Sequence, residues 1–476
     1  MPVLKPAGQN CYRIHRHGKM NADVLVYLNQ QLFQSSLEDQ SLQQLMDAAS
    51  LKGVIDPVVG MPDIHSGFGL PIGGVMAMDA EKGLISAGAV GMDINCGVRL
   101  LQTNIDPGGL DKSTLRELIK AIEQRVPSGV GRKSKHHNLI KSNFKALVEE
   151  GVPYLIEEGF GRKADLEAIE DRGVISGADL NVVSKEARKR GLQLSTIGGG
   201  NHFIELGFVE TVFDHHTAAV YGLRKGMLTV LIHTGSRGFG HQICNDFTAI
   251  MKEKAPAYKI ELPSAGLASV PIKSDTGEKY LAAMACAINF AFCNRQWITD
   301  DVRKAFSTVF GDDDKNFDLS LVYDVAHNTA RFEEIGGRSM LIHRKGATRA
   351  LPTGHSENPE QYRLTGHPVI IPGSMGTASY VVRAEPDVSK IYNSVNHGAG
   401  RVLSRRSAKK EISVDDLKSE LSEVIVSGRN FKAYLDEAPQ AYKDIEMVID
   451  TFDEIDMISK VARLLPLAVI KGEGSD

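Results

Sequence analysis

Residues that commonly bind metals lie on glycine-rich loops and at the ends of apolar segments of this chain. The segments are MPDIH (61–65), GMDINCG (91–97), GGGNHFIE (198–205), LIHTGSRG (231–238), DVAHN (324–328) and NHGAGR (396–401). A single loop histidine is more often a hydrogen-bonded structural residue than a ligand. The same histidines combined with Asp93 and Cys96 favour a metal centre.

Asp93 and Cys96 are separated by two residues, so one tight turn would direct both side chains at the same point. Carboxylate, thiolate and imidazole together suit Zn²⁺, Mn²⁺, Fe²⁺ or Co²⁺ better than Mg²⁺ or Ca²⁺. His233 and His327 each end an apolar segment, where a rigid sheet would hold them for coordination. Ligand chemistry alone leaves Zn²⁺ and Mn²⁺ both open.

Glycine-rich loops suggest a phosphate ligand. In GGGNHF, PGSMGTAS and NHGAGR, small residues would let backbone N–H groups approach phosphoryl oxygens. None of these loops matches the Walker or Rossmann pattern, and ordinary turns would explain each glycine separately. Of the basic clusters RKSKHH (132–137), HRKGATR (343–349) and RVLSRRSAKK (401–410), the second resembles a phosphate-handling loop and the others resemble solvated surface.

The elements that must position these residues alternate irregularly between strands and helices. Strands are expected within 52–105 (for example Gly73–Met78 and Gly97–Gln102), within 194–234, over LSLVYDVAHN (319–328), and near 338–342, 367–372 and 378–383. Helices are expected from a capping box at Thr114 and Glu117 to about Val126, at 138–149 and 180–190, over 241–310, and through most of 413–465 before a short final strand, PLAVIKG. The apolar stretch Tyr280–Cys293 is too short for a membrane span and is expected to be a buried helix.

This order predicts an α+β fold with a β-rich core and peripheral helices, in a single domain over residues 1–476. The net charge of −4 gives no overall attraction for nucleic acid, so any RNA contact must come from local basic patches. Five cysteines without CxxC spacing indicate a reducing compartment, and no apolar signal segment is recognised at the N-terminus. A cytoplasmic protein is expected.

The segments MPDIHSGFGLPIGG, GMDINCGVRL, GGGNHFIELG, HTGSRGFGHQI, DVAHN, HRKGATRA, PGSMGTASY, HGAGR and VIKG together resemble the RtcB family of RNA ligases. The resemblance extends from about Gly60 to Gly472, with the motifs in the family's order. It implies an RtcB-type fold around a deep cleft. It also implies a reaction, in which an RNA 2′,3′-cyclic phosphate or 3′-phosphate is joined to a 5′-hydroxyl in tRNA splicing or RNA repair, with GTP and Mn²⁺. Some relatives require an activating protein of the archease type.

The resemblance also implies a role for each matching residue. Cys96 would bridge two metal ions, one of them also bound by His233 and His327 and the other by Asp93 and His202. His397 would be the nucleophile that carries guanylate. The family often has Cys before this histidine, whereas this chain has Asn396.

The implied nucleotide contacts lie in several segments. They are Asn201, His202, Phe203, Ile204, Glu205, His327, Asn328, Pro372, Gly373, Ser374, Met375, Ser379, His397, Gly398, Ala399, Gly400, Tyr442 and Lys471. Glu205 and Lys471 are expected to read the guanine edge, and Tyr442 to stack on the base or flank it. Further candidates are Arg344, Lys345 and Arg401 for RNA or triphosphate, and Asp63 and His65 as groups that support the site.

Two alternatives use the same residues. A metallohydrolase, such as a cyclic-phosphate phosphodiesterase or a phosphatase, would need the two metals but neither a nucleotide loop nor His397. A non-catalytic RNA-binding protein would use Cys96 in a structural Zn²⁺ site. A covalent guanylate adduct on His397 would separate the ligase from both.

Overall fold

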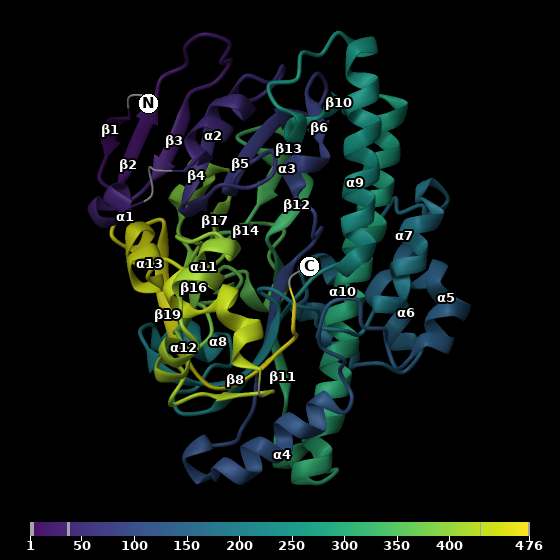
Figure 1. The fold of residues 1–476 in the computed structure, drawn as a ribbon, viewed down its shortest axis with the longest axis vertical. Helices are drawn as coiled ribbons and strands as arrows, with labels where there is room; N and C mark the ends of the chain where they lie inside the picture. Colours follow the sequence, from purple (N-terminus) through teal and green to yellow (C-terminus); the bar gives the residue numbers. More distant parts are fainter. Residues whose placement is uncertain (1–3, 36–38, 429, 475–476) are drawn as a thin grey trace.

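The computed structural model describes residues 4–35, 39–428 and 430–474. Two large sheets occupy its centre (Figure 1). The first sheet has seven strands, in the order β1 (Lys5–Gly8), β2 (Cys11–Ile14), β3 (Val24–Tyr27), β4 (Val58–His65), β5 (Ile72–Asp79), β13 (Arg338–Lys345) and β12 (Asn328–Ile335).

The second sheet holds most of the predicted ligand segments. Its order is β11 (Ser320–Ala326), β7 (Gly97–Gln102), β9 (Leu228–Thr234), β8 (Phe203–Val212), β19 (Ile458–Lys471), β16 (Ser379–Ala384) and β15 (Val369–Ile371), and β18 (Ile425–Val426) pairs with β19. Two small antiparallel pairs complete the β structure: β6 (Leu84–Ser86) with β10 (Ser269–Pro271), and β14 (Ala347–Arg349) with β17 (Ser394–Asn396).

Helices surround the sheets, and α9 and α10 run along one side of them (Figure 1). The helices are α1 (Gln30–Ser35), α2 (Ser41–Ala49), α3 (Ala87–Val90), α4 (Lys112–Glu123), α5 (His137–Glu149), α6 (Gly151–Glu157), α7 (Lys185–Lys189), α8 (His215–Val220), α9 (Arg237–Lys254), α10 (Asp275–Phe310), α11 (Arg405–Glu411), α12 (Val414–Glu420) and α13 (Ile445–Asp453). The α+β fold with a β-rich core is therefore confirmed. Among the described helices, none has the length and apolar character that crossing a bilayer requires.

Helix α10 connects the surrounding helices to the second sheet through side-chain hydrogen bonds. The Ser274 hydroxyl caps its start by accepting from Gly277 N (3.1 Å), and Asp275 and Glu278 in its first turn complement the helix dipole. The predicted buried helix Tyr280–Cys293 lies within it and is confirmed. Further along, Arg295 donates to the carbonyls of Asn95 and Thr234 (both 2.9 Å), so α10 fixes the backbone next to Cys96 and next to His233.

Most predicted elements are confirmed, and four are corrected. The predicted helical block 241–310 is interrupted between α9 and α10, where residues 255–274 form short turns and the strand β10. Helix α4 is capped by Asp111, whose carboxylate accepts from Thr114 N (2.7 Å), so the predicted capping box at Thr114 and Glu117 is wrong. Residues 180–190 form a short 3₁₀ turn and the five-residue helix α7 instead of one helix. The mainly helical prediction for 413–465 is wrong in its last part, because β19 starts at Ile458 and pairs with β8 and β16.

Candidate active site

In the second sheet, the predicted metal ligands lie at the same end of four adjacent strands. In the order β11-β7-β9-β8, His327 follows β11, Cys96 precedes β7, His233 lies near the end of β9 and His202 precedes β8. Because neighbouring strands are antiparallel, the ends of two of them meet the starts of the other two. His327 N also donates to Cys96 O (2.9 Å), which sets these two residues side by side.

The ligand atoms lie close enough to share cations. Cys96 Sγ is 3.3 Å from His202 Nε2 and 3.4 Å from His233 Nε2, and His233 Nε2 is 3.4 Å from His327 Nε2. Asp93 Oδ2 is 2.9 Å from His202 Nε2. Two donor groups result, Cys96–His233–His327 and Asp93–Cys96–His202, each with its atoms within 4.8 Å of one another. Cys96 belongs to both groups, which is the arrangement that the family resemblance implies.

Burial shifts the pKa of these donor groups. Burial holds the pKa of His233 and His327 well below the usual range, so both imidazoles are neutral and keep a lone pair for coordination. Burial, with Asp93 beside it, raises the pKa of the Cys96 thiol well above its usual range. A bound cation would offset that effect, because metals bind the thiolate. The donor set therefore fits two borderline divalent ions.

A glycine allows the carboxylate to reach the other donors. A Cβ on Gly235 would lie 2.5 Å from Asp93 Oδ2, so a larger residue here would displace the carboxylate. Gly235 follows β9 directly after His233 and Thr234. The LIHTGSRG motif thus supplies both a ligand and the space that another ligand needs.

His397 lies next to the ligand groups but belongs to a different part of the fold. It follows β17, which pairs with β14 at the end of the first sheet. Its ring centroid is 4.8 Å from that of His327, and its side chain keeps 15% of its surface exposed. The chain turns away after it at Gly400 (φ +73°), where a Cβ would overlap the backbone of Asp63.

Asp63 fixes the orientation of His397. Its buried Oδ2 is 2.6 Å from His397 Nδ1 and accepts from the backbone N–H groups of His397 (3.0 Å) and Gly398 (3.3 Å). A carboxylate is only an acceptor, so Nδ1 carries a proton, and in the neutral ring Nε2 keeps the lone pair. Lys443 Nζ donates to the carbonyls of Pro62 (3.1 Å) and Ile64 (2.7 Å) and holds the end of β4 in place. Asp63 therefore contacts His397 directly, in agreement with its predicted supporting role.

A cavity of about 390 Å³ opens beside these groups. Most of the predicted nucleotide contacts line it: Asn201, His202, Phe203, His327, Asn328, Pro372, Gly373, Ser374, Met375, His397, Gly398, Ala399, Gly400, Tyr442 and Lys471. His65, Lys345 and Arg401 line it as well. The predicted cleft is therefore present and joins segments from both sheets.

Three predicted contacts lie outside the residues that line the cavity. Ile204 points to the opposite face of β8 and packs in the core against α4, so its side chain is not available to a nucleotide there. Ser379 supports the cavity-lining loop at Pro372–Met375, because its hydroxyl accepts a hydrogen bond from Gly373 N (3.2 Å). Glu205 lies on the same side of β8 as Phe203 but deeper, and burial raises its pKa to about 8.

The sequence analysis missed Glu437, which joins several cavity residues. Its carboxylate accepts from the Tyr442 hydroxyl and lies 3.4 Å from Arg401 Nη1, 3.6 Å from Arg405 Nε and 3.8 Å from Lys471 Nζ. The Arg401 guanidinium also covers one face of the Tyr442 ring, at 4.8 Å. No local motif marks Glu437. The cavity also includes Phe68, Met92, His241 and Arg405, to which the sequence analysis gave no role.

Arg344 is a buried structural residue, so its predicted contact with RNA or triphosphate is wrong. It is fully buried, pairs with Glu333, and donates to Ser394 Oγ (2.8 Å) and Tyr392 O (2.7 Å). Tyr392 and Asn393 both have positive φ (60° and 48°), a conformation that costs free energy in residues other than glycine. Arg344 thus holds a strained turn five residues before His397.

We expect Arg344→Met to lower the free energy of unfolding by roughly 1.5–3 kcal/mol, the scale for a hydrogen bond to a charged group, because the buried Glu333 carboxylate loses this partner and keeps Arg349, at 3.4 Å. Arg338→Met is a matched control on the same strand. Arg338 pairs with Asp79 at the surface (3.0 Å) and is 54% exposed, so its loss should cost about 1 kcal/mol or less. Denaturant titration of both variants measures the difference, and equal losses would contradict the role given to Arg344.

Comparison with known proteins places the chain among RNA ligases. A family model described as tRNA-splicing ligase RtcB matches residues 44–472. The chain is 41% identical to the tRNA-splicing ligase RtcB of Thermococcus kodakarensis, over 95% of each chain. It is 42% identical to the protein of the same name from Archaeoglobus fulgidus, over 95% of each chain. Identity is also 42% to the RNA-splicing ligase RtcB of Mycobacterium tuberculosis, over 90% of this chain and all of that protein.

Proposed function

Because this chain belongs to the RtcB family, we propose that it is a GTP-dependent RNA ligase that carries guanylate on His397. It joins an RNA 3′-phosphate, or a 2′,3′-cyclic phosphate after hydrolysis, to a 5′-hydroxyl. The proposed substrates are tRNA halves and broken RNA ends, and an activating protein of the archease type is a proposed partner. The observation that carries the proposal is the imidazole of His397, oriented by Asp63 beside two donor groups that share Cys96.

Asp63 prepares His397 for nucleophilic attack. With the ring proton held on Nδ1, Nε2 can attack the α-phosphorus of GTP. A P–N bond forms, the bond from the α-phosphorus to its bridging oxygen breaks, and pyrophosphate leaves. The imidazole becomes positively charged as the P–N bond forms, and the Asp63 carboxylate stabilises that charge at 2.6 Å.

The guanylate then passes to RNA. An oxygen of the 3′-phosphate attacks the guanylate phosphorus, the P–N bond breaks, and His397 regains its neutral ring. The product is an RNA(3′)pp(5′)G end. The RNA 5′-hydroxyl attacks the phosphorus of the former 3′-phosphate, loses its proton and displaces GMP, which leaves a phosphodiester.

The metal-binding residues fit this chemistry. Cys96, His233 and His327 would hold one Mn²⁺, and Asp93, Cys96 and His202 the other. Bound Mn²⁺ would supply positive charge that offsets the developing charge on phosphoryl oxygens. His327 belongs to the first donor group, and its ring is 4.8 Å from that of His397. The proposed nucleophile therefore lies next to the first metal-binding group.

We assign recognition of guanine to Glu205 and Lys471 and a flanking position to Tyr442. An ionised Glu205 can accept from guanine N1–H and N2–H₂, which adenine does not offer. Arg401 already covers one face of Tyr442, so the base would use the other face or the ring edge. Glu437 holds this set together through Tyr442, Arg401 and Lys471.

GTP affinity should depend on the ionisation of Glu205. Burial raises its pKa to about 8, so the free protein carries a neutral carboxyl at pH 6–7. If guanine requires the ionised form, affinity for guanosine should increase with pH up to about 8, by at most roughly tenfold per pH unit. Calorimetry with guanosine, which has no phosphate to titrate, measures this effect.

Glu205→Gln is the matched control for this pH dependence. It should bind guanosine with little pH dependence and lose roughly 1–3 kcal/mol of preference for guanosine over adenosine. An unchanged pH profile or an unchanged preference in the variant would contradict the assignment of Glu205.

The proposed function is tested by ligation of defined RNA ends. An RNA with a 3′-phosphate and an RNA with a 5′-hydroxyl are incubated with the protein, GTP and Mn²⁺, and each component is omitted in turn. We expect a ligated product that requires both GTP and Mn²⁺. Hydrolysis of the phosphate end without joining would favour the metallohydrolase instead.

A further inference from the structure

Two stretches of the chain contain no acidic residue, and one of them, 388–410, lines the active-site cavity with His397 to Arg401 and Arg405. Residues 124–148 contain Arg125, Arg132, Lys133, Lys135, Lys141 and Lys145, with no Asp or Glu. Residues 388–410 contain Lys390, Arg401, Arg405, Arg406, Lys409 and Lys410, again with no Asp or Glu. The whole chain has a net charge of −4, so these two stretches concentrate positive charge that the average composition does not show.

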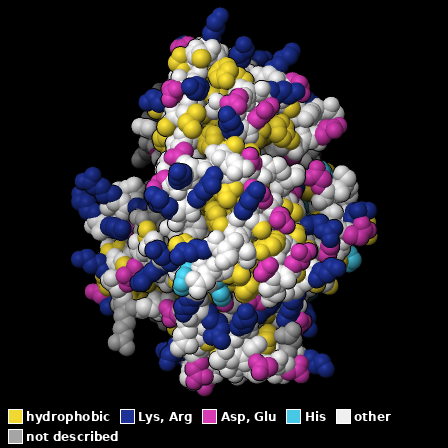
Figure 2. Space-filling model, turned by 90° about the vertical axis from the view of Figure 1, so that its right-hand side faces the viewer, with side chains coloured by type: hydrophobic (Ala, Val, Ile, Leu, Met, Phe, Trp, Pro, Cys, Tyr) yellow, Lys and Arg dark blue, Asp and Glu magenta, His cyan; other side chains and the backbone are white. Residues whose placement is uncertain are grey.

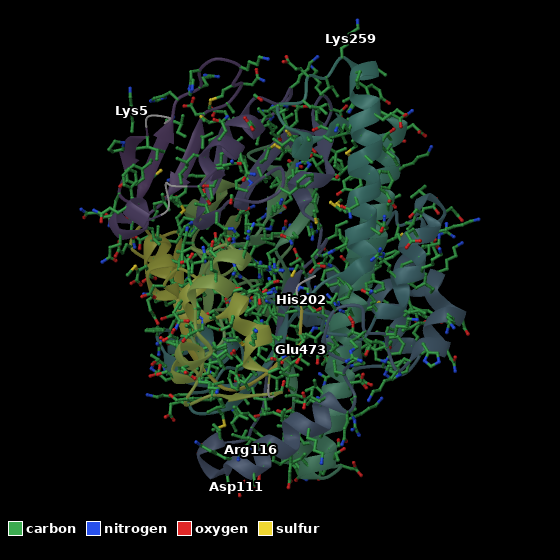
Figure 3. All side chains as sticks on the ribbon, viewed as in Figure 1. Lys5, Asp111, Arg116, His202, Lys259 and Glu473 are labelled. Carbon is green, nitrogen blue, oxygen red and sulfur yellow. The ribbon has the colours of Figure 1, made fainter. Side chains whose placement is uncertain are left out.

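Both stretches meet at the 198–201 loop that leads to His202. On one side, Gly129 N donates to Gly198 O (2.8 Å), and Val130 N donates to Glu473 O (3.3 Å). On the other side, a Cβ on Gly200 would lie 2.8 Å from an Arg405 nitrogen. Figure 3 shows His202 and Glu473 close together at the centre of the view. At Gly129, the first stretch therefore contacts the loop that leads to the candidate metal ligand His202.

Three cations of the first stretch form what we call the basic ridge: Arg132, Lys133 and Lys135. All three are exposed, and within residues 4–35, 39–428 and 430–474 none of them forms an ion pair with a carboxylate. In the second stretch, by contrast, Arg405 pairs with Glu437 and Lys409 with Asp436. Figure 2 shows Lys and Arg side chains gathered on the left and centre of one face of the molecule, with histidine side chains beside them.

A solvated surface is the simplest explanation of a basic run, but the exposed faces of helices α7 and α10 differ from the ridge, which lies in the loop before α5. On α10, Lys279 pairs with Asp275 and Lys304 with Asp300, and on α7, Lys189 pairs with Glu186. Those faces alternate charge, as solvated helices commonly do. The basic ridge has no such alternation, and it lies in the loop whose residues Gly129 and Val130 contact the 198–201 loop. Unpaired cations at this place fit a polyanion.

We propose that the basic ridge binds the phosphate backbone of the RNA substrate outside the cavity, along the strand that leads away from the end being joined. This inference rests on the proposed function. Contacts to phosphates position a nucleic acid without reading its sequence, which suits a ligase that must accept different ends. The cavity of about 390 Å³ is far smaller than a long RNA, so the strand must continue over the protein surface.

The test is a variant with Arg132→Gln, Lys133→Gln and Lys135→Gln, compared with a control carrying Lys52→Gln, Lys252→Gln and Lys259→Gln. The control residues are exposed and lie on other surfaces, with Lys259 at the far end of the molecule from His202 (Figure 3). For a long RNA with a 3′-phosphate, the ridge variant should raise KM roughly tenfold or more at moderate salt. Its salt slope should fall by about 2, the value for three single-strand phosphate contacts.

Two further measurements separate this inference from the proposed function. A trinucleotide ending in a 3′-phosphate should be used equally well by the ridge variant, the control and the wild type, because it does not reach the ridge. Labelling of the protein by GTP should also be equal. If the wild type ligates but the ridge variant keeps the control's KM and salt slope, or loses trinucleotide activity as well, the ridge proposal is wrong. If the wild type joins no ends, the proposed function fails instead.

Discussion

His397→Ala should abolish the covalent transfer of guanylate to the protein, and ligation should fall by at least roughly 10⁴-fold, the scale for loss of an essential nucleophile. The physical reason is local. His397 Nδ1 is held by Asp63 at 2.6 Å, and its partly exposed ring borders the cavity. Incubation with GTP labelled in its α-phosphate and Mn²⁺, followed by denaturing electrophoresis, measures the adduct.

Two controls make the His397 experiment specific. His17→Ala removes an exposed histidine near the N-terminus that does not line the cavity, and this variant should label like the wild type. Asp63→Asn keeps the shape of the supporting residue but removes its charge, and should slow labelling by roughly 10–100-fold. If His397→Ala is labelled as strongly as the wild type, another residue accepts the guanylate. If the wild type is not labelled at all, the metallohydrolase alternative gains support.

The sequence identifies the metal donors well because the strands that carry them are specified locally. MLTVLIHTG and LSLVYDVAHN are nearly continuous apolar runs, as expected for strands buried on both faces, and each reaches a histidine where the run ends. In the structure, β9 is buried along its whole length and His327 directly follows β11. Periodicity alone cannot show that these strands are neighbours. That information came from the resemblance.

Elements that depend on distant partners could not be predicted in the same way. The segment ISKVARLLPLAVIK mixes apolar and basic residues at spacings that also suit a helix, so its first half was predicted to be helical. It forms β19 because it pairs with β8, about 260 residues earlier, and with β16. Tertiary pairing of this kind overrides local preference.

Charged residues were the least predictable part of the site. Arg344 belongs to a basic cluster that resembles a phosphate loop, yet its partners Glu333 and Tyr392 bury it. Glu437 is the second residue of an ordinary acidic pair, Asp436 and Glu437, but its carboxylate contacts Tyr442, Arg401 and Lys471. In both cases the role of the charge depends on residues that the fold brings from elsewhere, and no local pattern records them.

Cys96→Ser should remove metal binding and most ligation, since Cys96 is the donor that both groups share. A serine hydroxyl remains protonated at neutral pH and is a poor ligand for borderline divalent ions, whereas the thiolate is a strong one. Changes to groups that only support a metal ligand cost roughly 10–100-fold, so losing the shared ligand should cost more than about 100-fold in ligation. Metal content after dialysis against Mn²⁺ should fall in parallel.

Thermal unfolding distinguishes a lost metal site from a damaged fold. A ligand that binds the folded state raises the unfolding temperature in proportion to the logarithm of its concentration over Kd, so Mn²⁺ should stabilise the wild type. Cys244→Ser is the matched control, because Cys244 is equally buried but lies outside the donor groups, with Sγ 3.6 Å from Ala87 O. Both serine variants bury a hydroxyl, and both should lose some stability without metal. Mn²⁺ should raise the unfolding temperature of Cys244→Ser but leave that of Cys96→Ser nearly unchanged. An equal Mn²⁺ response in the two variants would show that Cys96 does not hold the ions together.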